Sequence, residues 1–174
     1  GVPVLVEKPI AASVDQAERL VELADQQQAL LQVGHVERFN PAAQAAFRSC
    51  GAPKYIRAER LSPYAFRSTD IGVVLDLMIH DIDLVLSLAR SEVRSVEAFG
   101  VTVLGEKEDN VNARLRFENG CIADLVANRV CPSSRRAMDI WSASGGTPLD
   151  VTPRDNASVQ PTATLLYGTP PPER

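Results

Sequence analysis

The chain has 174 residues, of which 45% are hydrophobic and 23% charged, and its formal net charge is −4. This is the composition of a globular protein with a sizeable core, and the negative charge argues against a nucleic-acid partner. No apolar run reaches the ~20 residues that a membrane span needs. Three cysteines without paired spacing favour a reducing cytoplasm over a disulfide framework or a zinc site.

The first 36 residues predict the end of an α/β domain. Residues 2–6 and 29–33 are short apolar runs typical of buried parallel strands, and the residues between them have helical spacing after a possible cap at Ser13. Strand, helix and strand in this order form a βαβ unit.

Residues 37–152 predict a second, α+β domain that begins with helices. Asn40 and Pro41 suit the cap and first turn of a helix that runs to about residue 49. A strand is expected at 55–61, and the polar and aromatic segment 62–72 is interpreted as a loop near a site. Residues 74–89 predict a long helix.

The remainder of this domain predicts a sheet. The hydrophobic period changes to two, and Asn119-Gly120 is a hairpin signal. Successive strands of this kind indicate an open, largely antiparallel sheet with helices covering one face. The expected strands cover residues 96–104, 110–117, 121–129 and 136–143, Gly145-Gly146 is interpreted as a turn, and residues 153–174 are expected to form a loose or divergent tail.

The first candidate for chemistry is Lys8, in the segment Glu7-Lys8-Pro9 that follows the first strand. Ligands of open α/β sheets bind outside the carboxyl ends of the strands, and an amine there can polarise a hydroxyl or carbonyl oxygen. The alternative is a surface lysine followed by a turn proline, and position alone leaves both open.

A second polar segment, residues 34–41, follows the second strand of the βαβ unit. Arg38 suits a phosphate or carboxylate because its guanidinium donates two parallel hydrogen bonds. Asn40 can be either a helix cap or a ligand. Otherwise the segment is only a loop that leads into a helix.

The third candidate is a group of polar residues on the long helix, Asp76, His80 and Asp83. Their spacing places them on one helix face, and a carboxylate one turn from a histidine can orient an imidazole that acts as a base. Two alternatives remain, a purely structural pair or a metal site formed by Asp76, His80 and Asp83, with or without His35. We expect no metal, because the usual ligand spacing is missing.

Together these segments resemble the glucose-fructose oxidoreductase / inositol dehydrogenase / MocA family. Its members carry Glu-Lys-Pro at the end of a Rossmann domain, then an Arg-Phe-x-Pro type segment, then Asp-x-x-x-His-x-x-Asp on a helix. Here these are Glu7-Lys8-Pro9, Arg38-Phe39-Asn40-Pro41, and the helix residues Asp76, His80 and Asp83. The match in order and spacing extends to about residue 150. The sequences of these segments are most similar to those of nucleotide-sugar members, such as UDP-N-acetylglucosamine 3-dehydrogenases.

The resemblance implies an NAD- or NADP-dependent dehydrogenase of a sugar or nucleotide sugar. His80 would take the hydroxyl proton, Asp76 would orient it, and Lys8 would polarise the reacting oxygen. The cofactor would contact Glu7, Lys8 and Pro9, often with a cis Lys-Pro bond. The residues expected to bind the substrate are Arg38, Asn40, Tyr64 and Asp83.

The resemblance also implies a Rossmann segment before residue 1, so residues 1–36 would be only its last part. Without a glycine-rich phosphate loop, the chain alone should bind NAD(H) weakly. Two other functions stay open: a non-catalytic sheet module for dimerisation or sugar binding, and a metal-dependent sugar isomerase or lyase. We expect a homo-oligomer through the open sheet face, where outward apolar residues such as Val101, Leu115 and Leu125 would need cover.

Overall fold

The computed structural model describes residues 1–66 and 70–150, so the expected tail at 153–174 lies outside the described residues. The described chain forms two compact units, Gly1–Val36 and a second unit that begins at Glu37. Within the described ranges, no helix is both long and apolar enough to cross a membrane.

The first unit is the predicted βαβ arrangement. It contains β1 (Val4–Val6), α1 (Val14–Gln26) and β2 (Leu31–Val33), and the two strands pair in parallel. Ser13 caps α1, because its side chain accepts a hydrogen bond from the backbone N–H of Gln16. Since the strands are parallel, their carboxyl ends meet at one edge.

The second unit begins with helices and one strand. A short 3-10 turn, η1 (Val36–Phe39), leads into α2 (Pro41–Ser49), and β3 (Pro53–Leu61) follows. The long helix has two parts, a π-helical turn η2 (Val74–Met78) and a regular helix α3 (Ile79–Ala89).

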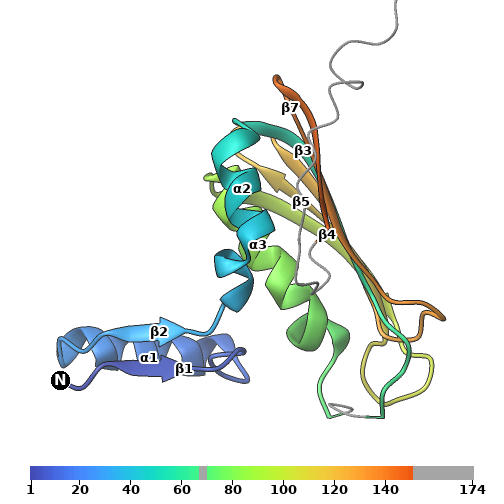
Figure 1. Cartoon of the computed structure of the whole chain (residues 1–174). Coiled ribbons are helices and arrows are strands. Elements are labelled where there is room, and N and C mark those ends of the chain that lie inside the picture. The colour runs from blue at the N-terminus through green and yellow to red at the C-terminus, as the bar shows by residue number, and fades with distance from the viewer. Residues whose placement is uncertain (67–69, 151–174) are drawn as a thin grey trace, which may run out of the picture. The chain divides into compact units, whose positions relative to one another are not determined.

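The remaining strands build the expected open sheet. They are β4 (Val93–Val101), β5 (Asn110–Phe117), β6 (Ile122–Asn128), β7 (Arg135–Ser142) and β8 (Gly145–Asp150), in the order β4-β5-β6-β3-β7-β8. Among the described strand pairs of this sheet, β3–β6 is parallel and the other four are antiparallel. Figure 1 shows α2 and α3 on one face of this sheet, so the α+β prediction is confirmed.

One local prediction was wrong, and a second is confirmed with a change in the type of helix. Gly145-Gly146 was expected to be a turn, but the turn lies at residues 143–144 and Gly145 already begins β8. The first part of the predicted helix 74–89 is π-helical, since the backbone N–H of Ile79 reaches the carbonyl of Val74. Apolar periodicity does not distinguish a wide helical turn from a regular one.

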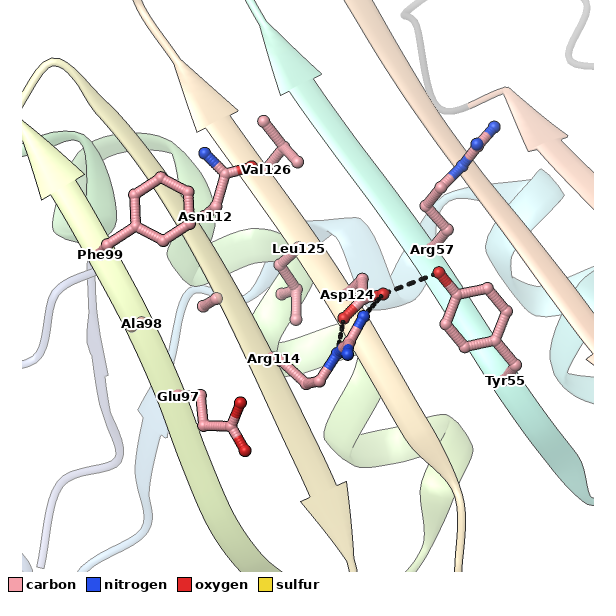
Figure 2. A pocket seen from close by; sticks show the side chains of 11 residues that line it. Tyr55, Arg57, Glu97, Ala98, Phe99, Asn112, Arg114, Asp124, Leu125 and Val126 are labelled. Carbon is pink, nitrogen blue, oxygen red and sulfur yellow. Dashed lines mark hydrogen bonds and ion pairs between the residues drawn. The ribbon is translucent and has the colours of Figure 1, made fainter.

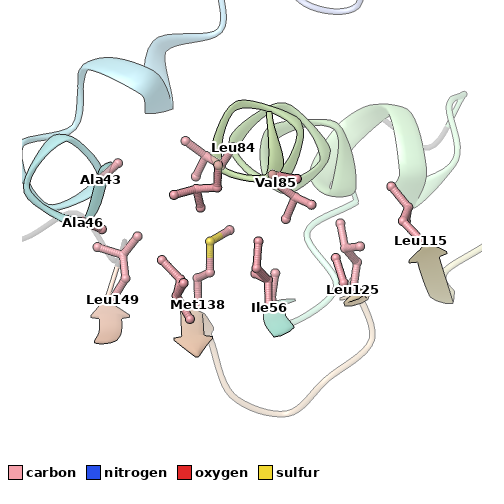
Figure 3. Packing of buried hydrophobic residues seen from close by; sticks show 14 of the residues in the cluster. Ala43, Ala46, Ile56, Leu84, Val85, Leu115, Leu125, Met138 and Leu149 are labelled. Atoms are coloured by element: carbon pink, nitrogen blue, oxygen red, sulfur yellow. The ribbon is translucent and has the colours of Figure 1, made fainter. Parts of the chain in front are cut away.

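The core lies between the helices and the sheet. Leu84 and Val85 of α3 pack over Ile56 and Met138, as Figure 3 shows. The helix-facing side of the sheet also buries Leu115 and Leu125, so neither needs cover on the open face, whereas Val101 is 47% exposed. Burial of this apolar surface is the main force that holds the helices on the sheet.

Candidate functional site

The carboxyl ends of β1 and β2 carry the first group of candidate residues. Glu7 and Lys8 follow β1 directly, and Gly34 follows β2. The Lys8–Pro9 peptide bond is cis. A Cβ atom at Gly34 would lie 3.1 Å from the Glu7 carboxylate, so the glycine leaves room for that carboxylate beside the end of β2.

The second group lies on the long helix of the second unit. Asp76 belongs to the π-helical turn and His80 is the second residue of α3, and both side chains are half-buried. Gly72 accepts the backbone N–H of Asp76. A side chain at Gly72 would collide with the carboxylate of Glu108, so a larger residue here would require the Glu108 side chain to move. A π-helical turn is rare and frequently found at functional sites.

Two of the predicted substrate residues contact each other. Arg38 donates two hydrogen bonds to Asp83, Nε to Oδ2 at 2.7 Å and Nη2 to Oδ1 at 2.6 Å. Asp83 is buried, while 49% of the Arg38 side chain remains exposed. The pair therefore joins η1 to α3 and leaves about half of the Arg38 side chain exposed.

The other two predicted substrate residues have local contacts. Asn40 is the N-cap of α2, where its side chain accepts the backbone N–H of Ala42 at 2.9 Å, as the cap interpretation predicts. Tyr64 lies in the loop before the long helix and packs edge-on against Phe66, with ring centroids 4.9 Å apart. A substrate role for Asn40 and Tyr64 stays a prediction.

A buried charge network that sequence reasoning missed lies beside His80. Arg60 on β3 donates to Asp81 through Nε at 3.0 Å and Nη2 at 2.8 Å, and to Glu37 through Nη1 at 3.2 Å. Burial raises the pKa of Asp81, and Arg60 opposes that shift. A signal did exist in the sequence. Ile56, Ala58 and Arg60 alternate along one strand face, and a charge at a core position requires a partner.

A second buried pair holds the segment that leads into the long helix. Asp109 is completely buried and accepts the Nε of Arg129 at 2.7 Å. Arg129 also donates from Nη1 to the carbonyl of Ile71 at 2.8 Å. Since the backbone N–H of Val73 donates to the Glu108 carbonyl, the chain just before Asp76 is tied to the neighbouring strands at two points.

Taken together, the second unit presents a carboxylate and an imidazole on an anchored helix. This is an arrangement suited to proton transfer, since histidine changes charge near neutral pH. No cluster of three or more potential metal ligands occurs among residues 1–66 and 70–150.

The open face of the sheet carries a different kind of surface. Figure 2 shows Arg114 bound to Asp124 through two hydrogen bonds of 2.6 and 2.7 Å, with Tyr55 donating to the same carboxylate at 2.8 Å. The strand register places Arg114 and Asp124 in line with charged residues on the neighbouring strands. These residues form a row across the sheet in which the charge alternates in sign. Across β4, β5, β6, β3 and β7 it reads Glu97, Arg114, Asp124, Arg57 and Asp139.

Two family models match the two units separately. Residues 42–147 match the GFO/IDH/MocA C-terminal domain, and residues 1–35 match the oxidoreductase family with an NAD-binding Rossmann fold. The match to the first model covers more than half of the chain.

Individual relatives agree with both models. The chain is 41% identical over 142 residues to UDP-N-acetylglucosamine 3-dehydrogenase from Acidithiobacillus ferrooxidans, which covers 81% of this chain and 45% of that protein. A solved structure of that relative has a TM-score of 0.80 at 38% identity and covers 85% of this chain and 50% of its own. Bacillus subtilis scyllo-inositol 2-dehydrogenase (NAD(+)) is 29% identical, with coverage of 76% and 43%. The chain thus spans about half the length of the curated relatives it matches.

Proposed function

Because the chain belongs to the GFO/IDH/MocA oxidoreductase family, we propose that it contributes the proton-transfer helix of an NAD(P)-dependent dehydrogenase. The substrate is the hydroxyl of a sugar or nucleotide sugar. The nucleotide-sugar class is favoured because the relative named for UDP-N-acetylglucosamine is 41% identical, against 29% for the scyllo-inositol relative.

The observation that carries this proposal is the pair Asp76 and His80 on one anchored helix. The His80 imidazole takes the proton of the substrate hydroxyl, and the Asp76 carboxylate orients the ring and stabilises the imidazolium. The Lys8 ammonium polarises the reacting oxygen, on which negative charge develops. Arg38, whose side chain is half exposed, binds an anionic or hydroxyl group of the substrate.

The edge formed by β1 and β2 fits one end of a nicotinamide cofactor. Glu7 offers a carboxylate that accepts hydrogen bonds from hydroxyl or amide groups, and Lys8 offers a donor beside it. Because Gly34 has no side chain, the Glu7 carboxylate has room beside the end of β2. When bound, the cofactor accepts the hydride of the substrate carbon.

The test is an activity assay on the protein encoded by the complete reading frame. NAD⁺ and NADP⁺ are each supplied with UDP-N-acetylglucosamine, UDP-glucose, scyllo-inositol or myo-inositol, and formation of reduced nicotinamide is followed. We expect turnover of a UDP-sugar and slower or no turnover of the inositols. Reduction of neither cofactor with any of these substrates would contradict the proposal.

We also propose that the protein assembles through the open sheet face and works in the cytoplasm. The charged row alternates in sign, so it complements a second copy that is turned around and displaced by one strand. Exposed Phe99 and Val101 flank this row and lose water contact on association. All three cysteines are free, in keeping with a reducing compartment.

Phe99→Glu should therefore weaken self-association of the complete protein. Phe99 is 67% exposed on β4, so the substitution leaves the core intact but places a charge in the apolar part of the interface. Sedimentation velocity should show the wild type as an oligomer and the variant shifted towards monomer. Leu86→Glu, at an exposed position of α3 on the helix side, is the matched control and should sediment like the wild type. A wild type that stays monomeric at high micromolar concentration would contradict assembly.

A further inference from the structure

The contact between α3 and the sheet is mostly apolar. Leu84 and Val85 pack over Ile56 and Met138, as seen in Figure 3. Close packing of these side chains limits the movement of the helix. A bidentate ion pair adds a directional restraint, because two parallel N–H···O bonds define both a distance and an angle. Helix α3 has two such restraints, Arg60–Asp81 in its first turn and Arg38–Asp83 in its second.

Arg60 makes such a contact at the residue next to His80. Its guanidinium holds Asp81 through two nitrogens, at 3.0 and 2.8 Å, and Glu37 through the third, at 3.2 Å. Arg60 is 2% exposed and Asp81 is 3% exposed. In this low-dielectric setting the bonds are stronger than at the surface. One side chain of β3 thus restrains both α3 and η1.

The position of this contact along the helix matters for His80. The π-helical turn ends at Met78, and α3 begins at Ile79. A π-helical turn inside a helix departs from the regular i→i+4 bonding, so the residues after it are rotated relative to an uninterrupted α-helix. Asp81 is the third residue of α3, so Arg60 restrains the helix immediately after the junction.

We propose that Arg60 is a positioning residue for His80. Its bond to Asp81, supported by Glu37, fixes the first turn of α3 and therefore the direction of the imidazole, whereas Arg38 holds the next turn at Asp83. The role in dehydrogenation rests on the proposed function, whereas the orientation is a property of the chain itself and can be measured without activity.

The experiment uses variants that separate positioning from folding. Arg60→Met alone would leave the buried carboxylate of Asp81 and the partly buried one of Glu37 without their counter-ion, which destabilises the fold. The triple variant Arg60→Met/Asp81→Asn/Glu37→Gln removes the charges together and keeps the side-chain sizes similar. Arg60→Lys keeps the charge and loses the bidentate geometry. Arg94→Met, at an exposed position of β4, is the control.

The first readout is the NMR signal of His80. In the complete protein, His80→Asn and His35→Asn each remove one imidazole Cε1–H signal and so assign the signals of these two residues. In variants that retain a cooperative thermal transition, we expect the His80 signal to shift and broaden, more in the triple variant than in Arg60→Lys. The His35 signal should stay in place, and Arg94→Met should move neither. A His80 signal that coincides with that of the wild type in either folded variant would overturn the proposal.

The second readout is the rate of the complete protein. Displacement of a reacting group by about 1 Å can cost ~10²-fold in rate, so the triple variant should lose ~10- to 10²-fold in kcat. KM for the sugar should change much less. A folded triple variant that keeps the kcat of the wild type would also overturn the proposal. A wild type without dehydrogenase activity whose His80 signal still responds would instead refute the proposed function and leave the positioning role standing.

Discussion

His80→Asn should lower kcat of the complete protein by at least ~10²-fold, the usual contribution of a positioned general base. Asparagine keeps part of the shape and hydrogen bonding of histidine but cannot take up the hydroxyl proton. KM for the sugar should change little, since the lost interaction acts mainly in the transition state. Steady-state kinetics with each nicotinamide cofactor measures both values. His80 is only half-buried, so the fold should tolerate the change.

Two companion variants sharpen this result. Asp76→Asn should cost less than His80→Asn, because the base remains and only its orientation and charge stabilisation are lost. The carboxylate favours the imidazolium, so its removal should move the acidic limb of the pH–rate profile to lower pH. Lys8→Ala should also reduce kcat through the loss of a polarising charge. Near-normal turnover of His80→Asn would mean that the Asp76–His80 pair is structural.

Most elements of the fold could be predicted because each has a local cause. The cap at Asn40 and the hairpin at Asn119-Gly120 are encoded by adjacent residues, and the strands by a period of two. Strand β8 was missed because two glycines are typical of turns, although here they open an edge strand. The parallel pairing of β3 with β6 joins residues far apart in the sequence, which no local pattern reports.

Only those residues of the candidate site that form a sequence motif could be predicted. Lys8, Asp76 and His80 stand out because their residue types and spacing resemble those of a family. The residues that hold the site in place do not form a motif. Arg60 meets Asp81 and Glu37 only after the sheet and helices assemble, and Asp109 meets Arg129 across neighbouring strands. Spatial contacts of this kind are not visible in a single sequence, although a charge at an inward strand position is a usable signal.

The Asp109–Arg129 pair should be the largest single contribution to stability that a conservative change can remove. One carboxylate oxygen of Asp109 accepts the backbone N–H groups of Val103 and Leu104, both at 2.8 Å, and that of Gly105 at 3.3 Å. The other oxygen binds Arg129. Asp109→Asn removes the charge and leaves Arg129 buried without its counter-ion, which should cost about 3 to 5 kcal/mol at neutral pH.

This loss should depend on pH in a defined direction. Burial opposes ionisation of Asp109, but the backbone N–H groups and Arg129 outweigh it and hold the pKa well below its usual range. A group with a lowered folded-state pKa stabilises the protein above its unfolded pKa of ~3.9 and loses that contribution as the pH falls towards the folded value. The difference between wild type and Asp109→Asn should therefore be full at neutral pH and should shrink below about pH 4.

Urea unfolding followed by the fluorescence of Trp141, the only tryptophan, measures this difference in the sheet unit. The midpoint should fall by about 1 to 3 M at neutral pH with an unchanged slope. Glu118→Gln is the control, because Glu118 is exposed in the turn between β5 and β6 and lies outside the charged row of the open face. Exposed charges contribute at most about 1 kcal/mol, so this variant should unfold nearly like the wild type. Equal losses in the two variants, or a loss at Asp109 that does not shrink in acid, would show that the buried pair does not act through its charge.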